Sequence, residues 1–424
     1  LAVAAIQNSV QPASANTDFP DYSGKLSGLI PSLYGGDGII LCPGESCRHA
    51  GHFTAASLEE FNNLSLSVRD LSFPSINAKA GTQFKYDAVL DEFVPVTSSL
   101  SASVFAFDAE TVARGQFYLG MAYSVRRFDK LEGKSLDSLT VDLTHLDIGL
   151  PGNEHPCITD VEAPVDGECY AFEQDVVRLN LDLGLKEEML MLTGTYGLTD
   201  RFELGVQVPL VRTSMHVSSH ATIIENPSKE FFSSTLHYYG EGSEGADDAL
   251  QASRTGFGDM IVRLGYWPVQ TENAGWDVGV ITDVRLPTGD VEDFQGLPRV
   301  GLKSRLVVSR TMPVLGGQLR PHINLGYGFN TGLRHEQQVD YAVGASYGFT
   351  WKDGKNTLAF SLDFLGRHIA NGRDQMADDQ YDISLGIKAN LWRNVSLSYS
   401  CLKPVNDTGL RPKAQHIVGA QVRF

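Results

Sequence analysis

Strict alternation of apolar and polar side chains near the end of the chain constrains its fold more than any other feature. Residues 418–424 alternate Val, Ala, Val and Phe with Gly, Gln and Arg, and residues 395–401 set Val, Leu, Tyr and Cys against three serines. A period of two is typical of a β-strand with one apolar face. A soluble protein must bury such a face, whereas a transmembrane barrel turns it toward lipid.

The second half of the chain continues this pattern as a meander. From Gly256 onward, period-two segments are separated by Gly, Asn, Asp and Pro, and no helical period competes with them. No stretch approaches the roughly 18 consecutive apolar residues that a membrane-spanning helix requires. A spanning β-strand needs only about ten residues and alternates. The sequence therefore predicts an all-β fold, an antiparallel up-and-down transmembrane β-barrel.

Charged residues occupy the face opposite the apolar one in successive strands. A sandwich of two sheets would leave that face in bulk solvent, whereas a barrel would enclose it as a polar lumen with both signs paired. Two interpretations stay open, a structural network that holds an internal plug and selection of an anionic or polar-headed amphiphile. The candidate lumen-lining residues are Asp259, Arg263, Asp283, Arg285, Lys303, Arg305, Arg320, His322, Asp363, Arg367 and Lys388.

Aromatic residues near the strand ends fit the girdles that membrane proteins place at the two membrane–water interfaces. Tyr266, Trp267, Trp351, Trp392 and Phe424 lie close to such ends. We expect these side chains to face outward at the level of the lipid headgroups. We also expect Phe424 to engage the barrel-assembly machinery.

The number of strands follows from alternating short and long connections, counted back from the C-terminus. Earlier strands are expected at residues 117–128 and 175–198, and residues 202–223 form a hairpin with the latter across a three-residue turn. Twelve strands fit this alternation of short and long connections if residues 138–148 extend into an outer loop. Fourteen strands result if that segment and residues 84–94 are both counted. We predict twelve, with the short turns on the periplasmic rim.

The chain divides into three parts by pattern. Residues 1–15 are apolar and end in Ala-Ser-Ala, which is typical of a secretory-signal remnant or else an N-terminal tail. Residues 16–114 lack sustained alternation and are too many for a tail. We expect them to fold inside the barrel as a plug, with a separate periplasmic domain as the alternative. Residues 115–424 form the barrel.

Four of the five cysteines form two local pairs. Cys42 and Cys47 lie in a short loop rich in Pro and Gly, and Cys157 and Cys169 flank a loop of Pro, Gly and acidic residues. In an oxidising periplasm these pairs predict two short disulfides, with the connectivity left open. The spacing lacks the Cys-x-x-Cys-His motif of haem attachment and a second Cys pair for zinc. No metal or other cofactor is predicted.

Composition and motifs exclude other classes of function. The net charge of −17 argues against nucleic-acid binding, because affinity for phosphate requires clustered Lys and Arg. Residues 344–348 match the G-x-S-x-G pattern of serine hydrolases, but that motif needs a strand, a sharp turn and a helix, whereas alternation here continues unbroken. We predict no catalytic residue and no enzyme. A lipid hydrolase with a Ser and a His on the outer wall is the second alternative.

Three segments carry a resemblance to a known family. They read TYGLTDRFELGVQVPL at residues 195–210, GFGDMIVRLGY at 256–266 and RLPTGD at 285–290. They resemble the outer-membrane transporters associated with the meta-cleavage pathway of phenol degradation, which are distantly similar to long-chain fatty-acid channels. The resemblance covers roughly residues 190–424. The long N-terminal part and the cysteine pairs depart from a plain member of that family.

The resemblance implies a barrel that passes small hydrophobic or aromatic compounds, and it fixes no substrate. The expected location is the outer membrane of a Gram-negative bacterium. The expected partners are outer-membrane lipid and small hydrophobic solutes, with no nucleic acid. A structural or adhesive barrel without transport is the main alternative.

Overall fold

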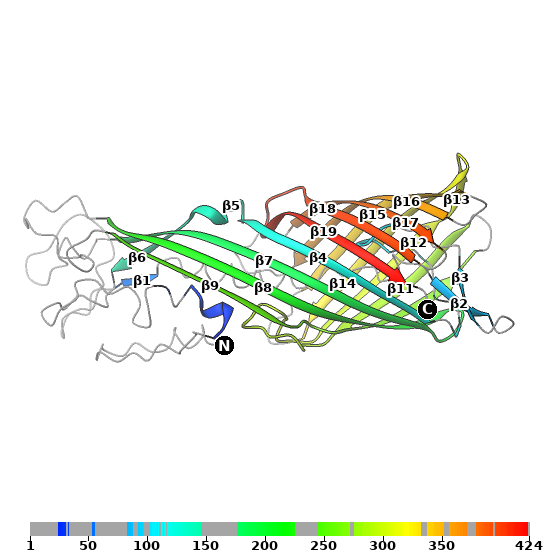
Figure 1. Cartoon of the computed structure of the whole chain (residues 1–424), viewed down its shortest axis with the longest axis horizontal. Helices are drawn as coiled ribbons and strands as arrows, with labels where there is room; N and C mark the ends of the chain where they lie inside the picture. Colours follow the sequence, from blue (N-terminus) through cyan, green and yellow to red (C-terminus); the bar gives the residue numbers. More distant parts are fainter. Residues whose placement is uncertain are drawn as a thin grey trace, which may run out of the picture. The chain divides into compact units, whose positions relative to one another are not determined.

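The structure of the chain is a computed structural model, drawn in Figure 1. The described residues are almost all in antiparallel strands, and the helices among them are two 3-10 turns, η1 (Leu26–Gly28) and η2 (Leu136–Ser138). No helix in this part of the chain is long and apolar enough to cross a membrane. The structure describes residues 24–30, 33, 53–55, 83–87, 92–96, 102–107, 109, 112, 114–115, 117–145, 176–224, 245–271, 275–331, 337–351, 356–370, 379–392 and 395–422.

The chain divides into two compact units. The larger comprises Asn63–Leu136, Gly184–Met215 and Ser253–Phe424, and the smaller comprises the remaining segments. In the smaller unit, β1 (Phe53–Ala55) pairs with β6 (Leu139–His145), which also pairs with the first residues of β7.

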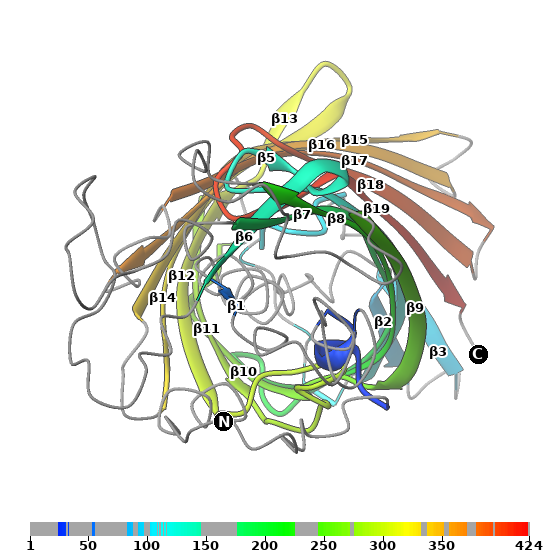
Figure 2. The same cartoon turned by 90° about the vertical axis from the view of Figure 1, so that its left-hand side faces the viewer.

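A closed ring of twelve antiparallel strands forms the larger unit, as predicted. Figure 2 shows the strands curving round to meet. The ring closes where β19 pairs with β4 and where β8 pairs with β10. The strands are β4 (Phe117–Leu131), β7 (Val176–Gly197), β8 (Phe202–Ile224), β10 (Ile261–Val269), β11 (Trp276–Arg285), β12 (Gly301–Arg310), β14 (Gly317–Asn330), β15 (Gln337–Trp351), β16 (Asn356–Ala370), β17 (Asp379–Trp392), β18 (Val395–Pro404) and β19 (Leu410–Val422).

The remaining strands do not enlarge the ring. A separate two-stranded sheet is formed by β2 (Gln83–Asp87) and β3 (Glu92–Val96). Two small additions, β5 (Lys134–Ser135) and β13 (Met312–Val314), pair with β4 and β14, and β9 (Gly245–Phe257) runs just ahead of β10 in sequence. The fourteen-strand alternative is therefore wrong, because the segment at 84–94 forms its own sheet and β6 lies in the smaller unit.

Side-chain alternation shows which face of the wall points inward. In β14, His322 and Asn324 are 1% and 4% exposed, whereas Ile323 and Leu325 are 51% and 54% exposed. A sandwich would bury the apolar face and expose the polar one, and β14 has the reverse arrangement. The wall therefore presents apolar side chains outward and polar ones inward, as in a transmembrane barrel.

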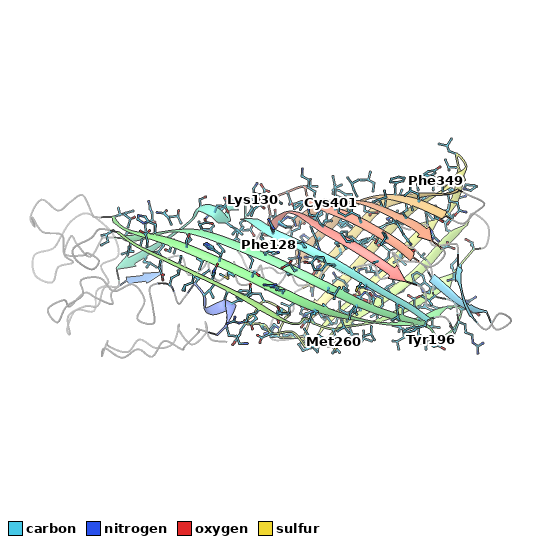
Figure 3. All side chains as sticks on the ribbon, viewed as in Figure 1. Phe128, Lys130, Tyr196, Met260, Phe349 and Cys401 are labelled. Atoms are coloured by element: carbon cyan, nitrogen blue, oxygen red, sulfur yellow. The ribbon has the colours of Figure 1, made fainter. Side chains whose placement is uncertain are left out.

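Short and long connections alternate around the ring. The short turn between β7 and β8 is held by Thr199, whose hydroxyl accepts hydrogen bonds from the backbone N–H groups of Arg201 and Phe202 at 3.1 and 3.0 Å. Gly115 donates to the carbonyl of Gly197 at 2.8 Å, so the chain enters the barrel at this same rim. Tyr196 lies near this rim, and Lys130 lies toward the other end of the wall (Figure 3).

Candidate functional site

Ten of the eleven candidate lumen-lining residues lie on strands of the wall and on its inward face, and Asp259 lies in the connection between β9 and β10. Arg285, Lys303 and Arg367 are half-buried, and the other residues of that set are buried. Most form ion pairs with one another or with inward acids that the sequence did not single out, among them Asp277 and Asp340. Pairing of both signs offsets the cost of enclosing them in a low-dielectric interior.

A segment ahead of the first barrel strand lies inside the barrel. We call it the lumen segment, meaning the described residues 102–107, 109 and 112, all of which are buried. Its backbone bonds to wall side chains instead of forming a strand ladder. Asn324 of β14 accepts from Phe107 N at 2.6 Å and donates to Phe107 O at 2.8 Å. Ala109 N donates to Ser309 of β12 at 3.1 Å, and Val112 N donates to Glu203 of β8 at 2.9 Å.

Phe107 is the main aromatic anchor of the lumen segment. The guanidinium groups of Arg263 and Arg305 lie 4.7 and 5.1 Å from the centre of its ring. Asp283 bonds to both arginines, at 2.6 Å from Arg263 Nε and 2.7 Å from Arg305 Nη1. A cation over an aromatic face contributes about 2 kcal/mol when both are desolvated. Two of the predicted lumen arginines therefore hold the segment in place.

Trp267 also packs against the lumen segment, which corrects the sequence interpretation. We expected Trp267 in an outward aromatic girdle, but its side chain is 0% exposed and packs with Phe107, Ala109 and Ile281. Consecutive strand residues point to opposite faces, so Trp267 must point inward because Tyr266 is outward and 37% exposed. The side chains of Trp351, Trp392 and Phe424 lie outside the described residues.

The other half of the lumen segment is held by apolar contacts. Val104 and Phe105 form one buried cluster with side chains of β7, β8, β18 and β19, including Met189, Met191 and Ile417. A Cβ at Gly386 of β17 would lie 2.5 Å from the carbonyl oxygen of Ala102. The glycine therefore leaves room for the backbone of the lumen segment. The segment contacts most of the strands around the ring.

Ser103, Asp363 and His322 form a fully buried chain of hydrogen bonds. Asp363 accepts from Ser103 Oγ at 2.7 Å through Oδ2, and its Oδ1 lies 2.7 Å from His322 Nε2. A hydrolytic triad requires the serine hydroxyl to bond to the imidazole, whereas here the carboxylate lies between them. This arrangement attaches the lumen segment to β14 and β16. Ser346 of the G-x-S-x-G match lies within the continuous strand β15, as predicted.

Two of the segments that carry the family resemblance meet in space. Asp259, after β9, forms an ion pair with Arg285 at 2.5 Å and accepts from the N–H groups of Gly289 and Leu297. Thr288 Oγ1 accepts from Met260 N at 2.9 Å. The GFGDM and RLPTGD segments thus clamp the loop of residues 286–300 to the wall. The sequence analysis did not predict that these two segments contact each other.

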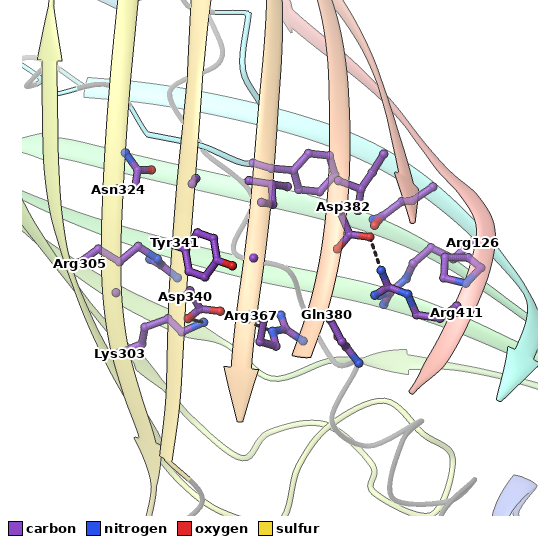
Figure 4. A pocket seen from close by; sticks show the side chains of 18 residues that line it. Arg126, Lys303, Arg305, Asn324, Asp340, Tyr341, Arg367, Gln380, Asp382 and Arg411 are labelled. Carbon is purple, nitrogen blue, oxygen red and sulfur yellow. Dashed lines mark hydrogen bonds and ion pairs between the residues drawn. The ribbon is translucent and has the colours of Figure 1, made fainter. Parts of the chain in front are cut away.

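A cavity of about 130 Å³ lies between the lumen segment and the wall (Figure 4). Phe105 of the lumen segment, Leu365 of β16 and Leu402 of β18 contribute apolar surface to it. Lys303, Arg367 and Gln415 contribute polar groups. Gln415 and Asp340 were not among the predicted residues, because nothing in a single strand indicates which inward groups surround a cavity.

The structure describes one of the five cysteines. Cys42, Cys47, Cys157 and Cys169 lie outside the described residues, so the two disulfides stay a prediction. Cys401 lies on β18 and is a free thiol.

These features together define an outer-membrane β-barrel of the channel class. The chain belongs to the family described as "Putative MetA-pathway of phenol degradation", whose model matches residues 184–401. No curated protein matches the sequence.

Among solved structures, the chain is similar to an outer membrane channel from Pseudomonas putida F1, with 12% identity over 76% of this chain and 100% of that chain and a TM-score of 0.37. A Pseudomonas aeruginosa FadL homologue has 11% identity over 73% and 90%, with a TM-score of 0.31. A mutant of the monoaromatic hydrocarbon channel TodX has 10% identity over 80% and 99%, with a TM-score of 0.33.

Proposed function

We propose that this channel passes small hydrophobic or aromatic compounds across the outer membrane. The family's description, which concerns phenol degradation, supports an aromatic solute. The solute enters between the longer loops, meets the apolar surface beside the lumen segment, and leaves along the charged interior or sideways into lipid. The predicted lumen residues act along this route mainly by holding the lumen segment and offsetting each other's charge.

The observation that carries the proposal is the cavity beside the lumen segment. Phe105, Leu365 and Leu402 give it apolar surface beside the charged and polar groups that also line it. Apolar surface combined with a few polar groups is typical of sites for small molecules. An interior that served only to stiffen the barrel would have no reason to keep such a space.

The lumen segment acts as the plug in this proposal. We propose that the lumen segment is part of the plug expected at residues 16–114, of which β1 instead pairs with β6 in the smaller unit. The ordered anchors at Ser103 and Phe107 hold the lumen closed, and a solute passes when the segment moves. The terminal Phe424 serves recognition by the barrel-assembly machinery, and lipid covers the outer wall.

Uptake into liposomes tests this function. Purified protein is reconstituted, and entry of phenol, toluene and a sugar of similar size is followed over time. We expect faster entry of the aromatic solutes than in protein-free liposomes, and no acceleration for the sugar. Aromatic entry equal to that of the protein-free control would contradict transport and favour a structural or adhesive barrel.

A further inference from the structure

The cavity beside the lumen segment has the size of one aromatic ring. Its volume is about 130 Å³, and an apolar cavity of about 150 Å³ in another protein holds one benzene molecule. Phe105 and Leu402 are each 8% exposed and line one side, with Leu365 beside them. A single-ring compound therefore fits this space.

On the polar side of the cavity, Lys303 and Arg367 share the carboxylate of Asp340, whereas Asp382 pairs with Arg411. Lys303 Nζ lies 2.5 Å from Asp340 Oδ2, and Arg367 Nε lies 3.5 Å from Asp340 Oδ1. One carboxylate thus serves two cations, and Arg367 contacts it only at long range. Arg367 and Lys303 both line the cavity and come from β16 and β12 (Figure 4). An additional anion would complete this arrangement, because a guanidinium prefers two short parallel bonds to an oxyanion.

A second and independent feature points to a ligand with an acceptor oxygen. Gln415 of β19 is 1% exposed and lines the same cavity. Its Nε2 donates to no described residue. A buried amide donor without an acceptor costs about 1–3 kcal/mol, and an oxygen of a bound solute would offset that cost.

We propose that this cavity binds a single-ring aromatic carboxylate. The ring lies on Phe105, Leu365 and Leu402, the carboxylate bonds to Arg367 and Lys303, and a further ring oxygen, where present, accepts from Gln415. The inference rests on the proposed channel function only for the route by which the solute reaches the cavity. Phenol is neutral at pH 7, since its hydroxyl ionises near pH 10 like that of tyrosine, so the site favours an aromatic acid over phenol.

Calorimetric titration of the full chain in detergent tests the inference. Benzoate, 4-hydroxybenzoate, phenol and benzyl alcohol are the probes. We expect saturable benzoate binding at one site per chain, with phenol and benzyl alcohol at least about tenfold weaker, because each lacks a charge-assisted hydrogen bond. Arg367→Gln should weaken benzoate binding about tenfold, and Arg367→Lys should restore part of it. Gln415→Leu should weaken 4-hydroxybenzoate more than benzoate.

Arg178→Gln is the matched control, because it removes the same charge from an exposed ion pair with Asp142 away from the cavity. Benzyl alcohol binding as tightly as benzoate, unchanged benzoate affinity in Arg367→Gln, or no saturable benzoate binding would each overturn the inference. Loss of uptake in liposomes with benzoate binding intact would contradict the channel function and leave the site standing. Uptake of phenol by a protein that does not bind benzoate would support the channel function and contradict the binding site.

Discussion

Phe107 connects the lumen segment to the wall through a small number of contacts. Its ring receives two guanidinium groups and packs on Trp267, while its backbone bonds to Asn324 at both N and O. Both arginines are in turn fixed by Asp283. Since these groups come from β10, β11, β12 and β14, the one residue Phe107 connects the segment to four of the twelve strands of the ring.

Replacing Phe107 should loosen the lumen segment without unfolding the barrel. In Phe107→Ala the two arginines lose their aromatic contact and the segment loses its largest anchor, which we expect to raise amide hydrogen exchange across residues 102–112. Mass spectrometry of peptic peptides measures this rate. Phe257→Ala removes an outward side chain that is 63% exposed and serves as the control. Equal exchange in both variants would contradict the anchoring role.

Trp267 and its neighbour Tyr266 should differ sharply in their effect on stability. Trp267→Ala removes a fully buried ring, and such truncations cost about 3–5 kcal/mol. Tyr266→Ala removes an outward side chain that stacks on Phe202 at 4.5 Å, so it should cost much less. Urea unfolding in detergent compares the two. A larger loss for Tyr266→Ala would mean that Trp267 faces outward after all.

Much at the residue scale was predictable, and the exceptions have physical causes. A period of two places Arg263 and Asp283 on the inward face without further information. It cannot show that Arg263 contacts Phe107, because Phe107 lies more than a hundred positions earlier in a segment without alternation. The prediction for Trp267 was wrong because it relied on the position of this residue near the strand end. It ignored that Trp267 directly follows the outward Tyr266 and must therefore point inward.

At the scale of elements, the loop of residues 286–300 is attached to the wall by side chains of two strand ends. Asp259 is fully buried and accepts from Arg285, Gly289 and Leu297, and Thr288 donates to the carbonyl of Gly258 at 2.8 Å. These hydrogen bonds hold the chain between the end of β9 and the start of β10 against the loop.

Asp259→Ala should release this loop. Removing one partner of a buried ion pair costs about 3–5 kcal/mol, because the other charge stays buried without compensation. We expect faster tryptic cleavage after Arg299, measured by gel electrophoresis of the folded protein in detergent. Glu292→Ala changes an exposed acid of the same loop and should leave cleavage unchanged. Identical cleavage in the two variants would mean that Asp259 does not hold the loop.

Strand boundaries were largely predictable from sequence, whereas the path of the lumen segment was not. The predicted strands at 117–128, 175–198 and 202–223 agree closely with β4, β7 and β8, because alternation and turn residues mark both ends of each. The lumen segment has no such signature, since the backbone of Phe107 and Ala109 bonds to the side chains of Asn324 and Ser309 instead of to a neighbouring strand.

At the scale of the whole larger unit, closure of the ring decides what the outward apolar face must contact. The pairing of β19 with β4 and of β8 with β10 removes free strand edges from the ring, which a barrel in lipid requires. Closure also encloses the charged interior, in which the lumen segment lies. Occlusion by that segment is therefore the central proposal.

Single-channel conductance in planar bilayers measures this occlusion most directly. The full chain and a variant lacking residues 101–112 are compared at the same salt and voltage, with Phe107→Ala as a variant that keeps the segment. We predict a small conductance for the full chain, a several-fold larger one for the deletion, and frequent transient openings for Phe107→Ala. Equal conductance of the full chain and a folded deletion variant would contradict the proposal that the lumen segment closes the barrel.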